Sequence, residues 1–369
     1  MSEIYVGLMS GTSADGLDAC LVRFRDRECE ILGHVHRAYP QGLRTRLLTA
    51  MHNTSLAAAA DLDVELANVA GAAISDLLAQ TGYSASEITA IGSHGQTVLH
   101  RPDTATPTSI QLGDPHRLAI LCGIDVVADF RRADVAAGGE GAPLAPGFHA
   151  WALATETEAR AVLNIGGMAN LTLLPTNGEP VIGFDTGPGN VLLDYWSERT
   201  TGQAMDDGGA RAATGTVDAA LLQRLEEDPY FDRRPPKSTG REHFNAEWLE
   251  QRLHERNLAA TAEHVQATLS ELTASTIATA LQREAPATRR LLVCGGGIEN
   301  ADLMARLRRR LPELPIESTG EYGVPPQQVE SVAFAWLARQ RIHERPGNIP
   351  SVTGADRELV LGAHVHGRR

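Results

Sequence analysis

The segment "IYVGLMSGTSADGLDACLVRF", residues 4–24, places a polar loop between two apolar runs. Each apolar run predicts a short strand. The loop between them is rich in glycine, serine, threonine and aspartate, although a tight two-residue turn would be enough to join two strands. The composition of this loop therefore calls for a chemical explanation.

A phosphate ligand would explain the loop. Glycine has no Cβ, so the backbone N–H groups of a glycine-rich turn can approach a phosphate closely. Ser10, Thr12 and Ser13 add hydroxyl donors, and Asp15 and Asp18 add carboxylates suited to a hydrated Mg²⁺. The loop is not a Walker A motif, because it lacks the G-x-x-x-x-G-K-[ST] pattern and leads into a strand. A hairpin with a polar tip is the alternative.

The same order of strand, glycine-rich loop and strand returns in "ARAVLNIGGMANLTLLP", residues 159–175. Strand patterns mixed with helical ones, such as residues 55–80 ending before Gly82, are typical of the α/β class. A chain of 369 residues is also too long for one ordinary core. We therefore predict two α/β domains with a duplicated core.

A carboxylate ends the next apolar run, in "VIGFDTGPGNVLLDYW", residues 181–196. Asp185 stands where α/β sheets place their ligands, at the carboxyl end of a strand. There it could act as a general base for a water molecule or a sugar hydroxyl. The alternative is that Asp185 caps the helix that follows.

A third glycine-rich turn, "VCGGGIEN", residues 293–300, follows a strand and precedes a helix. This context suits a nucleotide, although a tight strand–helix turn has the same pattern. Three such loops after three apolar strands favour a phosphate-bearing ligand.

Two further segments carry polar side chains for a substrate. "SHGQTVLHRP" offers His94, Gln96 and Thr97 as a polar lining for a sugar, although a lone histidine in a turn is more often a structural hydrogen-bonding group. In "VVADFRRAD", Arg131 could pair with a substrate carboxylate. Arg131 and Arg132 could instead form salt bridges with Asp129 or Asp134.

The net charge of −13 argues against binding to nucleic acid or to an anionic membrane, since both require a basic surface. The four cysteines form no C-x-x-C pair, and three lie in apolar runs, which indicates reduced thiols. The first residues show no signal-peptide pattern, and no apolar stretch approaches membrane-spanning length. We therefore expect a cytoplasmic protein.

Taken together, the motifs resemble the anhydro-N-acetylmuramic acid kinase family, of the actin/hexokinase/Hsp70-like kinase superfamily. The resemblance runs in order along essentially the whole chain, through "GLMSGTSADGLDA", "SHGQTVLHRP", "SIQLGDP", "DFRRADVAAGGEGAPLAP", "LNIGGMANLT", "GFDTGPGN", "KSTGREHFN", "VCGGGIEN", "FAWLA" and "RPGNIPSVTGA".

The resemblance implies a two-domain, actin-like (ribonuclease H-like) kinase fold with a central cleft. The first domain would contain residues 1–135 and 346–369, and the second residues 136–345. It implies an enzyme that uses ATP and Mg²⁺ to open the 1,6-anhydro bridge of 1,6-anhydro-N-acetylmuramic acid and to phosphorylate O6. The product would be N-acetylmuramic acid 6-phosphate, in cell-wall recycling. Family members are usually homodimers, so a homodimer is expected.

The resemblance also assigns residues. Asp185 would be the catalytic base. ATP would be bound by Gly11, Thr12, Ser13, Ala14, Asp15, Gly16, Leu17, Asp18, Gly166, Gly167, Asn170, Gly295, Gly296 and Gly297, with Mg²⁺ near Asp15 or Asp18. The sugar would be bound by Arg131, facing its lactyl carboxylate, with His94, Gln96 and Thr97. One departure is Glu140, where the family more often has glutamine; its charge would lie near an anionic substrate.

Three other functions remain alternatives. A kinase for a different sugar would not need an arginine that faces a carboxylate. An ATP-dependent binding or chaperone protein with an actin-like core would tolerate loss of the Asp185 carboxylate. A metal-dependent phosphate-ester hydrolase would need clustered histidine and aspartate ligands, which the motifs do not show.

Overall fold

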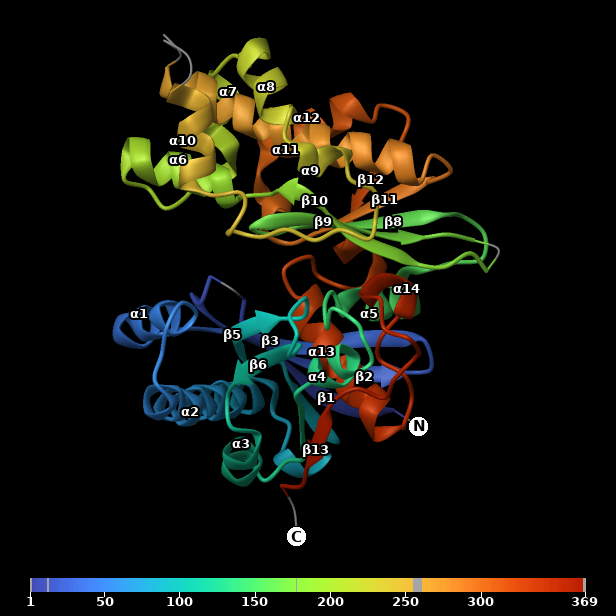
Figure 1. The fold of residues 1–369 in the computed structure, drawn as a ribbon. Helices are drawn as coiled ribbons and strands as arrows, with labels where there is room; N and C mark the ends of the chain where they lie inside the picture. Colours follow the sequence, from blue (N-terminus) through green and yellow to red (C-terminus); the bar gives the residue numbers. More distant parts are fainter. Residues whose placement is uncertain (1, 12, 177, 255–260, 368–369) are drawn as a thin grey trace. The chain divides into compact units, whose positions relative to one another are not determined.

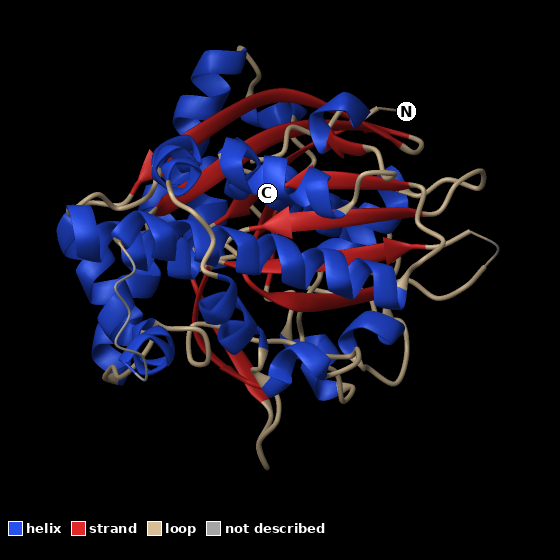
Figure 2. Ribbon diagram, turned by 90° about the horizontal axis from the view of Figure 1, so that it is seen from above, coloured by secondary structure: helices blue, strands red, loops and turns tan. Residues whose placement is uncertain are grey.

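The computed structural model describes residues 2–11, 13–176, 178–254 and 261–367. These divide into two compact units: unit 1, Met1–Ala152 with Gln328–Arg369, and unit 2, Leu153–Gln327. Both are of the predicted α/β class, with helices packed against sheets (Figure 2). The unit boundaries differ from those expected after residues 135 and 345, because two helices near the boundaries pack within unit 1.

Unit 1 begins with three consecutive strands, which are followed by helices and five shorter strands. Its N-terminal part is drawn in blue and teal and its C-terminal part in red in Figure 1. Its strands are β1 (Glu3–Met9), β2 (Gly16–Arg25), β3 (Glu28–Ala38), β4 (Ala90–Ser93), β5 (Gln96–Arg101), β6 (Thr108–Leu112), β7 (Val126–Ala128) and β13 (Ala363–Val365). Its α-helices are α1 (Gln41–Ala50), α2 (Leu56–Thr81), α3 (Pro115–Cys122), α4 (Arg132–Ala136), α5 (Ala145–Leu153), α13 (Val329–Ile342) and α14 (Pro350–Thr353), and Ala85–Glu87 forms a 3-10 turn.

The predicted helix over residues 55–80 is confirmed as α2. The side chain of Ser55 accepts a hydrogen bond from the N–H of Ala58 and caps its start. Gly82 ends it in the left-handed conformation, with φ of 75°, which glycine adopts without steric cost. Leu62, Leu66 and Leu77 of α2 are buried in the core of unit 1.

Unit 2 has a smaller sheet and a helical cover. Its strands are β8 (Arg160–Ile165), β9 (Met168–Leu174), β10 (Ile182–Pro188), β11 (Arg290–Cys294) and β12 (Ile316–Ser318). Its α-helices are α6 (Val191–Thr201), α7 (Ala210–Thr214), α8 (Ala219–Glu226), α9 (Pro229–Asp232), α10 (Ala246–His254), α11 (Ala262–Glu284) and α12 (Ala301–Arg310), with 3-10 turns at Asp207–Gly209, Gly296–Glu299 and Thr319–Tyr322.

The two main sheets share one topology, which confirms the duplicated core. In unit 1 the order is β13-β7-β4-β1-β2-β3, with β1, β2 and β3 antiparallel and β4 and β7 parallel to β1. In unit 2 the order is β10-β9-β8-β11-β12, with β8, β9 and β10 antiparallel and β11 and β12 parallel to β8. The loop of residues 10–15 therefore corresponds to the turn at Gly166–Gly167, and the fold is the expected duplicated, actin-like one.

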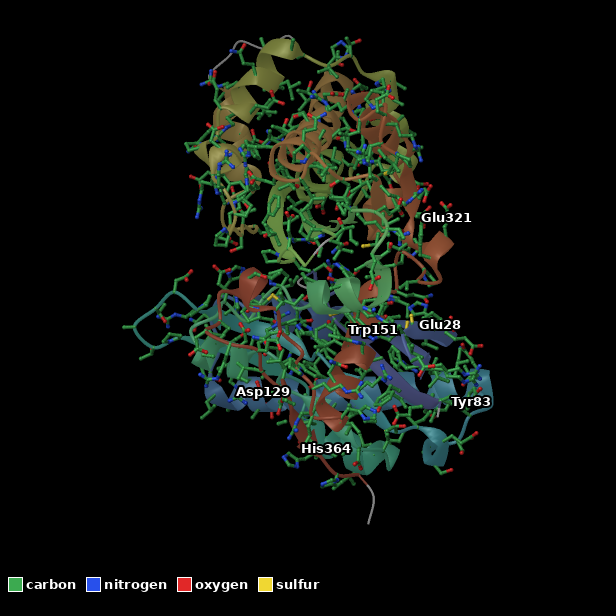
Figure 3. All side chains as sticks on the ribbon, turned by 90° about the vertical axis from the view of Figure 1, so that its right-hand side faces the viewer. Glu28, Tyr83, Asp129, Trp151, Glu321 and His364 are labelled. Atoms are coloured by element: carbon green, nitrogen blue, oxygen red, sulfur yellow. The ribbon has the colours of Figure 1, made fainter. Side chains whose placement is uncertain are left out.

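Helix α13 packs directly on the sheet of unit 1 because two strand residues have no side chain. A Cβ on Gly7 of β1 would lie 1.8 Å from the carbonyl oxygen of Ser331, and one on Gly92 of β4 would lie 2.0 Å from that of Phe334. Trp151 of α5, labelled in Figure 3, packs on Phe24 of β2 with ring centroids 5.6 Å apart. These contacts are why α5 and α13 belong to unit 1.

The C-terminal segment also joins unit 1, through one buried carboxylate. Asp134 is fully buried and accepts hydrogen bonds from the side chains of Asn348 and Thr353, both at 2.7 Å. It also accepts one from the N–H of Gly141 at 2.8 Å.

Among the helices of the described residues, none has the length and apolar content needed to cross a membrane.

Candidate active site

The first glycine-rich loop in unit 1, residues 10–15, is longer than a hairpin turn requires. The N–H of Ala14 donates to the carbonyl oxygen of Gly11 at 3.1 Å, and Ala14 has a positive φ of 48°. The hydroxyl of Ser13 donates to Asp15 Oδ1 at 2.6 Å. Gly16, Leu17 and Asp18 already belong to β2, so they border the loop. Thr12 lies outside the described residues.

Side chains from distant parts of unit 1 hold this loop. Gln96 Nε2 donates to the carbonyl oxygen of Gly11 at 3.1 Å, and Gln96 Oε1 lies within hydrogen-bond distance of the Ser10 hydroxyl. The Tyr39 hydroxyl donates to Ser10 Oγ at 2.9 Å, and burial raises the pKa of Tyr39 to about 12, so it stays a donor. Both the amide oxygen and the amide nitrogen of Gln96 therefore help to hold the loop.

The predicted sugar contacts His94 and Arg131 are joined in the structure. Arg131 Nη2 lies 2.8 Å from His94 Nε2, and Arg131 Nη1 donates to the carbonyl oxygen of Gly141 at 2.8 Å. Burial and the Arg131 cation lower the pKa of His94 to about 3, so the imidazole is neutral and its Nε2 accepts. Burial also lowers the pKa of Arg131 to about 10. Arg132, not Arg131, forms the salt bridge with Asp129, at 2.5 Å.

Two more residues of unit 1 complete this region. Thr97, next to Gln96 in the sequence, accepts a hydrogen bond from Gln111 Nε2 at 3.2 Å. Glu330 at the start of α13 lies within electrostatic range of Arg131 and Asp18. Glu330 is exposed, and the charges of Arg131 and Asp18 act on the pKa of its carboxylate in opposite directions. Glu330 was not predicted from the sequence, because this residue lies far along the chain in an apolar helix pattern.

The two carboxylates considered for Mg²⁺ differ in their surroundings. Asp18 Oδ1 is 3.0 Å from His34 Nε2 and 3.1 Å from His36 Nδ1, and these hydrogen bonds outweigh desolvation and lower the pKa of Asp18. Asp15 is exposed at the loop, with Ser13 as its hydrogen-bond donor. Exposed carboxylate oxygen suits a hydrated Mg²⁺, so Asp15 fits the ion better than Asp18, whose oxygen is already engaged.

The structure brings Asp185 and Asn170 together in unit 2. The register of β9 and β10 makes them cross-strand partners, and the strands shift register between Asp185 and Gly187. Asp185 Oδ2 accepts from the N–H of Thr239 at 3.0 Å. The Tyr230 hydroxyl donates to the Asp185 carbonyl oxygen at 2.8 Å, and the Asp185 N–H donates to the carbonyl oxygen of Lys237 at 3.2 Å. The segment of residues 230–239 therefore fixes both the backbone and the carboxylate of Asp185.

The second glycine-rich turn, Gly166–Gly167, lies against the residues that follow Asp185. The N–H groups of Gly189 and Val191 donate to the carbonyl oxygen of Gly167 at 2.9 and 3.1 Å, and that of Asn190 donates to Gly166 at 2.8 Å. A Cβ on Gly189 would lie 2.4 Å from the Gly166 carbonyl oxygen. Only glycine therefore permits this approach. Asp185 does not cap α6, whose N-cap residue is Asn190.

The third glycine-rich turn joins the same edge of the sheet. A Cβ on Gly295 would lie 2.3 Å from Asn164 Oδ1, and one on Gly297 would lie 2.3 Å from Ile165 Cγ2. Since Asn164 and Ile165 end β8 directly before Gly166, the second and third turns are neighbours. Asp185, Asn170 and the two turns thus form one constellation within unit 2.

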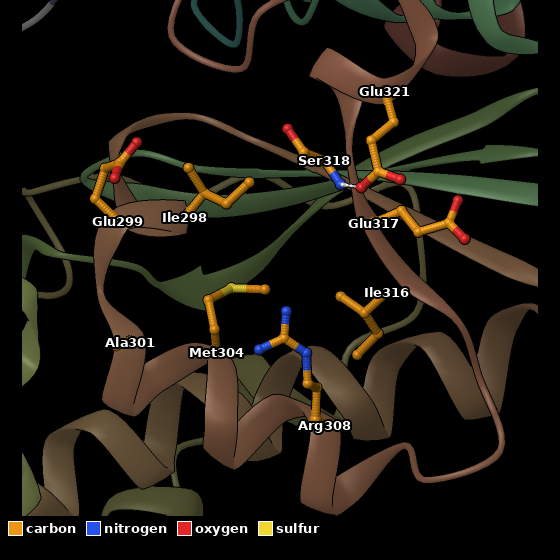
Figure 4. A pocket seen from close by; sticks show the side chains of 9 residues that line it. All are labelled: Ile298, Glu299, Ala301, Met304, Arg308, Ile316, Glu317, Ser318 and Glu321. Atoms are coloured by element: carbon orange, nitrogen blue, oxygen red, sulfur yellow. Dashed lines mark hydrogen bonds between the residues drawn. The ribbon is translucent and has the colours of Figure 1, made fainter.

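A pocket of about 330 Å³ adjoins the third turn (Figure 4). Figure 4 shows Met304 and Arg308 of α12 facing Ile316 of β12, and the pocket is lined by Ile298, Glu299, Ala301, Met304, Arg308, Ile316, Glu317, Ser318 and Glu321. Three glutamates against one arginine do not favour a polyphosphate. The apolar side chains suit an uncharged, flat group instead.

Two basic residues of unit 2 were not identified from the sequence. Arg241 Nη2 would be 3.9 Å from a Cβ at Gly167, and its charge acts on Asp194, whose pKa desolvation raises to about 6. Lys237 is buried, and its Nζ donates to the carbonyl oxygens of Tyr230 and Phe231 at 3.2 and 3.4 Å. Both belong to "KSTGREHFN". The clue was present, because Lys237 is the only lysine in the sequence.

Comparison with known proteins identifies the family. The family model described as anhydro-N-acetylmuramic acid kinase matches residues 3–367. A protein of that name from Xanthomonas axonopodis pv. citri (strain 306) is 50% identical over 368 residues, which cover 98% of each chain. Another from Saccharophagus degradans (strain 2-40 / ATCC 43961 / DSM 17024) is 47% identical over 365 residues, again 98% of each.

Among solved structures, the activator of the 2-hydroxyisocaproyl-CoA dehydratase from Clostridium difficile with bound ADPNP has a TM-score of 0.47 at 13% identity, covering 92% of this chain and 96% of that one. This likeness is too distant to indicate a ligand. The sequence relatives and the family model, by contrast, span nearly every residue. The chain belongs to the anhydro-N-acetylmuramic acid kinase family.

Proposed function

We propose that this enzyme uses ATP to convert 1,6-anhydro-N-acetylmuramic acid into N-acetylmuramic acid 6-phosphate and ADP, in cell-wall recycling. The observation that carries the proposal is the setting of Asp185. Its carboxylate lies at a sheet edge, beside two glycine-rich turns. The carboxylate, the backbone N–H and the backbone carbonyl oxygen of Asp185 each make a hydrogen bond with residues 230–239. A fixed carboxylate next to phosphate-binding turns suits a reaction that joins deprotonation to phosphoryl transfer.

Asp185 accepts a proton from a water molecule, whose oxygen then forms a bond to C1 of the sugar. The C1–O6 bond breaks and its electron pair stays on O6. O6 attacks the γ-phosphorus of ATP, the bond from that phosphorus to the β,γ-bridging oxygen breaks, and ADP leaves. Water thus supplies the new hydroxyl at C1, and ATP supplies the phosphoryl group at O6.

The other residues bind and orient. We assign the phosphates of ATP to the glycine-rich segments of each unit: the loop of residues 10–15 in unit 1, and the turns at Gly166–Gly167 and Gly295–Gly297 in unit 2. The pocket beside Gly297 takes the uncharged base of the nucleotide. Mg²⁺ would be held through Asp15, where it would neutralise charge on the transferred phosphoryl group. Arg131, positioned by Gly141 and His94, pairs with the lactyl carboxylate of the sugar.

Asp185→Asn tests the proposal. General-base catalysis is typically worth about 10²–10⁴-fold in rate, so turnover falls by about that factor while ATP binding stays near the wild-type affinity. Turnover is followed by coupled ADP release with Mg²⁺-ATP and the anhydro sugar. Asp232→Asn is the matched control, since Asp232 is an exposed carboxylate on nearby α9 and keeps normal turnover. Near-normal turnover of Asp185→Asn would falsify the assignment.

Substrate choice is tested with the same assay. ADP release with 1,6-anhydro-N-acetylmuramic acid, and a product heavier by one water and one phosphoryl group, supports the proposal. Release with N-acetylmuramic acid or N-acetylglucosamine instead would make the protein a kinase of ordinary sugars. Nucleotide binding without sugar-dependent ADP release would favour a binding protein.

A further inference from the structure

Two histidines and one aspartate gather at the edge of the unit 1 sheet formed by β7 and β13. Strand β13 pairs antiparallel with β7, with His364 opposite Val127 and Val365 opposite Val126. Continuing this register by one residue puts His366 opposite Asp125. Since side chains two apart on a strand share a face, Asp125, His364 and His366 lie on one face of the sheet. Figure 3 labels His364 in this region.

The three side chains already converge on one point. Asp125 Oδ2 is 2.8 Å from His364 Nε2 and 3.1 Å from His366 Nδ1, and one ligand atom from each residue lies within 4.8 Å of the others. The second oxygen, Asp125 Oδ1, accepts from the N–H of Gly367 at 3.0 Å, which fixes the carboxylate. Donors bound to a tetrahedral Zn²⁺ are about 3.4 Å apart, so only small side-chain shifts would admit an ion.

The charge and chemistry of the cluster favour a metal of the zinc class. The hydrogen bonds from Gly367 and the two histidines outweigh desolvation and lower the pKa of Asp125, so the carboxylate is ionised. Imidazole nitrogen suits Zn²⁺, Ni²⁺ or Cu²⁺, whereas Mg²⁺ prefers oxygen ligands. Two nitrogens and one carboxylate oxygen, with water in the fourth position, make a common zinc coordination set.

A second His-Val-His segment in the same sheet provides an internal comparison. His34 and His36 of β3 flank Asp18 of β2, also with Asp18 Oδ1 within 3.0 and 3.1 Å. Within the part of the chain that the structure describes, however, only Asp125, His364 and His366 bring three ligand atoms within 4.8 Å of one another. Asp18 lies opposite His36 just as Asp125 lies opposite His366, so neither the sequence pattern nor the strand register makes the site. The close approach of all three ligand atoms at Asp125 does.

We propose that Asp125, His364 and His366 bind one divalent transition-metal ion of the zinc class, which fastens the terminal strand β13 to β7. The ion replaces the two histidine–aspartate hydrogen bonds by three metal–ligand bonds. Because it binds the folded chain and not an unfolded one, it raises thermal stability. The site is independent of the proposed kinase reaction.

The test is a titration of the full-length, metal-free protein with ZnCl₂ alone, in a chelator competition assay and by isothermal calorimetry. We expect one tight site per chain, at least about tenfold weaker in His366→Gln and in His364→Gln. His366 is 73% exposed, so its replacement does not threaten folding. His36→Gln is the matched control and keeps the wild-type affinity. ZnCl₂ also raises the melting temperature of the wild type but not of His366→Gln.

Either of two results overturns the proposal. One is the absence of a saturable zinc site in the wild type. The other is a zinc site whose affinity is unchanged in both His364→Gln and His366→Gln. Such a site would lie elsewhere, for example at His36 if His36→Gln abolished it. ADP release with Mg²⁺-ATP is measured in parallel and stays the same in His366→Gln, so failure of the metal site is distinguishable from failure of the kinase function.

Discussion

The loop of residues 10–15 and the turn at Gly166–Gly167 occupy the same place in two sheets of the same topology, yet they are held in different ways. Buried side chains hold the first loop, chiefly those of Gln96 and Tyr39. Backbone hydrogen bonds from residues 189–191 hold the second turn. A long loop leaves peptide groups that need partners, and side chains supply them. A short turn needs only another backbone close by, which requires glycine there.

Among the substitutions that test how the turn at Gly166–Gly167 and the loop of residues 10–15 are held, Gly189→Ala should have the largest effect. Its Cβ would lie 2.4 Å from the Gly166 carbonyl oxygen and 3.1 Å from the Met168 carbonyl carbon, so the backbone must move. We expect a loss of about 1–3 kcal/mol in the free energy of unfolding, as for overpacked cores, and at least a hundredfold drop in kcat/KM. Urea unfolding and the ADP-release assay measure both.

Gly167→Ala is the matched change in the same turn. Its Cβ would meet only Arg241 Nη2, at 3.9 Å, which is an ordinary contact. Its unfolding midpoint should stay near that of the wild type. Equal stability of Gly189→Ala and Gly167→Ala would show that the backbone contact does not hold the turn.

Gln96→Met should have an intermediate effect, and it acts on the first loop. The Gln96 side chain is 1% exposed, and its loss removes one buried hydrogen bond from the Gly11 carbonyl oxygen and one from the Ser10 hydroxyl. Each such hydrogen bond contributes about 0.5–1.5 kcal/mol, so the loss of two costs about 1–3 kcal/mol. We expect that loss in unfolding free energy and a rise in KM for ATP on the order of tenfold, since the loop loses its position.

Gln340→Met is the control for this change. Gln340 Nε2 also donates to a backbone carbonyl oxygen in unit 1, that of Pro346 at 2.8 Å, but the bond is exposed. Its variant should resemble the wild type in both stability and KM. If Gln96→Met instead changes the KM for the sugar and leaves that for ATP unaltered, Gln96 contacts the sugar, as first predicted.

The sequence predicted those features that are local in the chain. The alternation of strands and glycine-rich loops indicated the duplicated core, and the apolar spacing with Ser55 and Gly82 defined α2. Asp185 was identified as a candidate because it directly follows an apolar run. Its role as a base stays a prediction, although the cap of α6 is Asn190, so the alternative of a helix cap is wrong.

The sequence could not predict which distant residues meet. Gln96 bonds to Gly11 across 85 positions, so its role as a loop support became visible only in the fold. The unit boundaries moved because α5 and α13 pack on a sheet formed by residues far away in the chain. Lys237 and Arg241 belong to a segment without periodicity, and only the contact of that segment with Asp185 and Gly167 indicates what they do.

Lys237 provides the finest test, because it is a buried charged residue of the segment that holds Asp185 and the only lysine of the chain. Burial, followed by the cations of Arg283 and Arg233, lowers its pKa to about 8, against about 10.4 in an unfolded chain. Between these two values the unfolded chain binds a proton that the native protein has released. The stability of the wild type relative to Lys237→Met should therefore rise as the pH increases from 8 to 10.

Urea unfolding of the wild type and Lys237→Met at pH 7.5, 8.5, 9.5 and 10 measures this difference. Reductive ¹³C-methylation adds a direct check, since Lys237 gives the only lysine signal, and its chemical shift should titrate near pH 8. Lys237→Arg should not restore the wild-type profile, because guanidinium keeps its proton throughout this range. A stability difference that is flat with pH, together with a signal that titrates above pH 10, would mean that the amine is solvated and that Asp185 is held without it, by the Tyr230 hydroxyl and by the backbone of Lys237 and Thr239. The turn at Gly166–Gly167 beside Asp185 would then still rest on backbone hydrogen bonds, whereas buried side chains support the loop of residues 10–15.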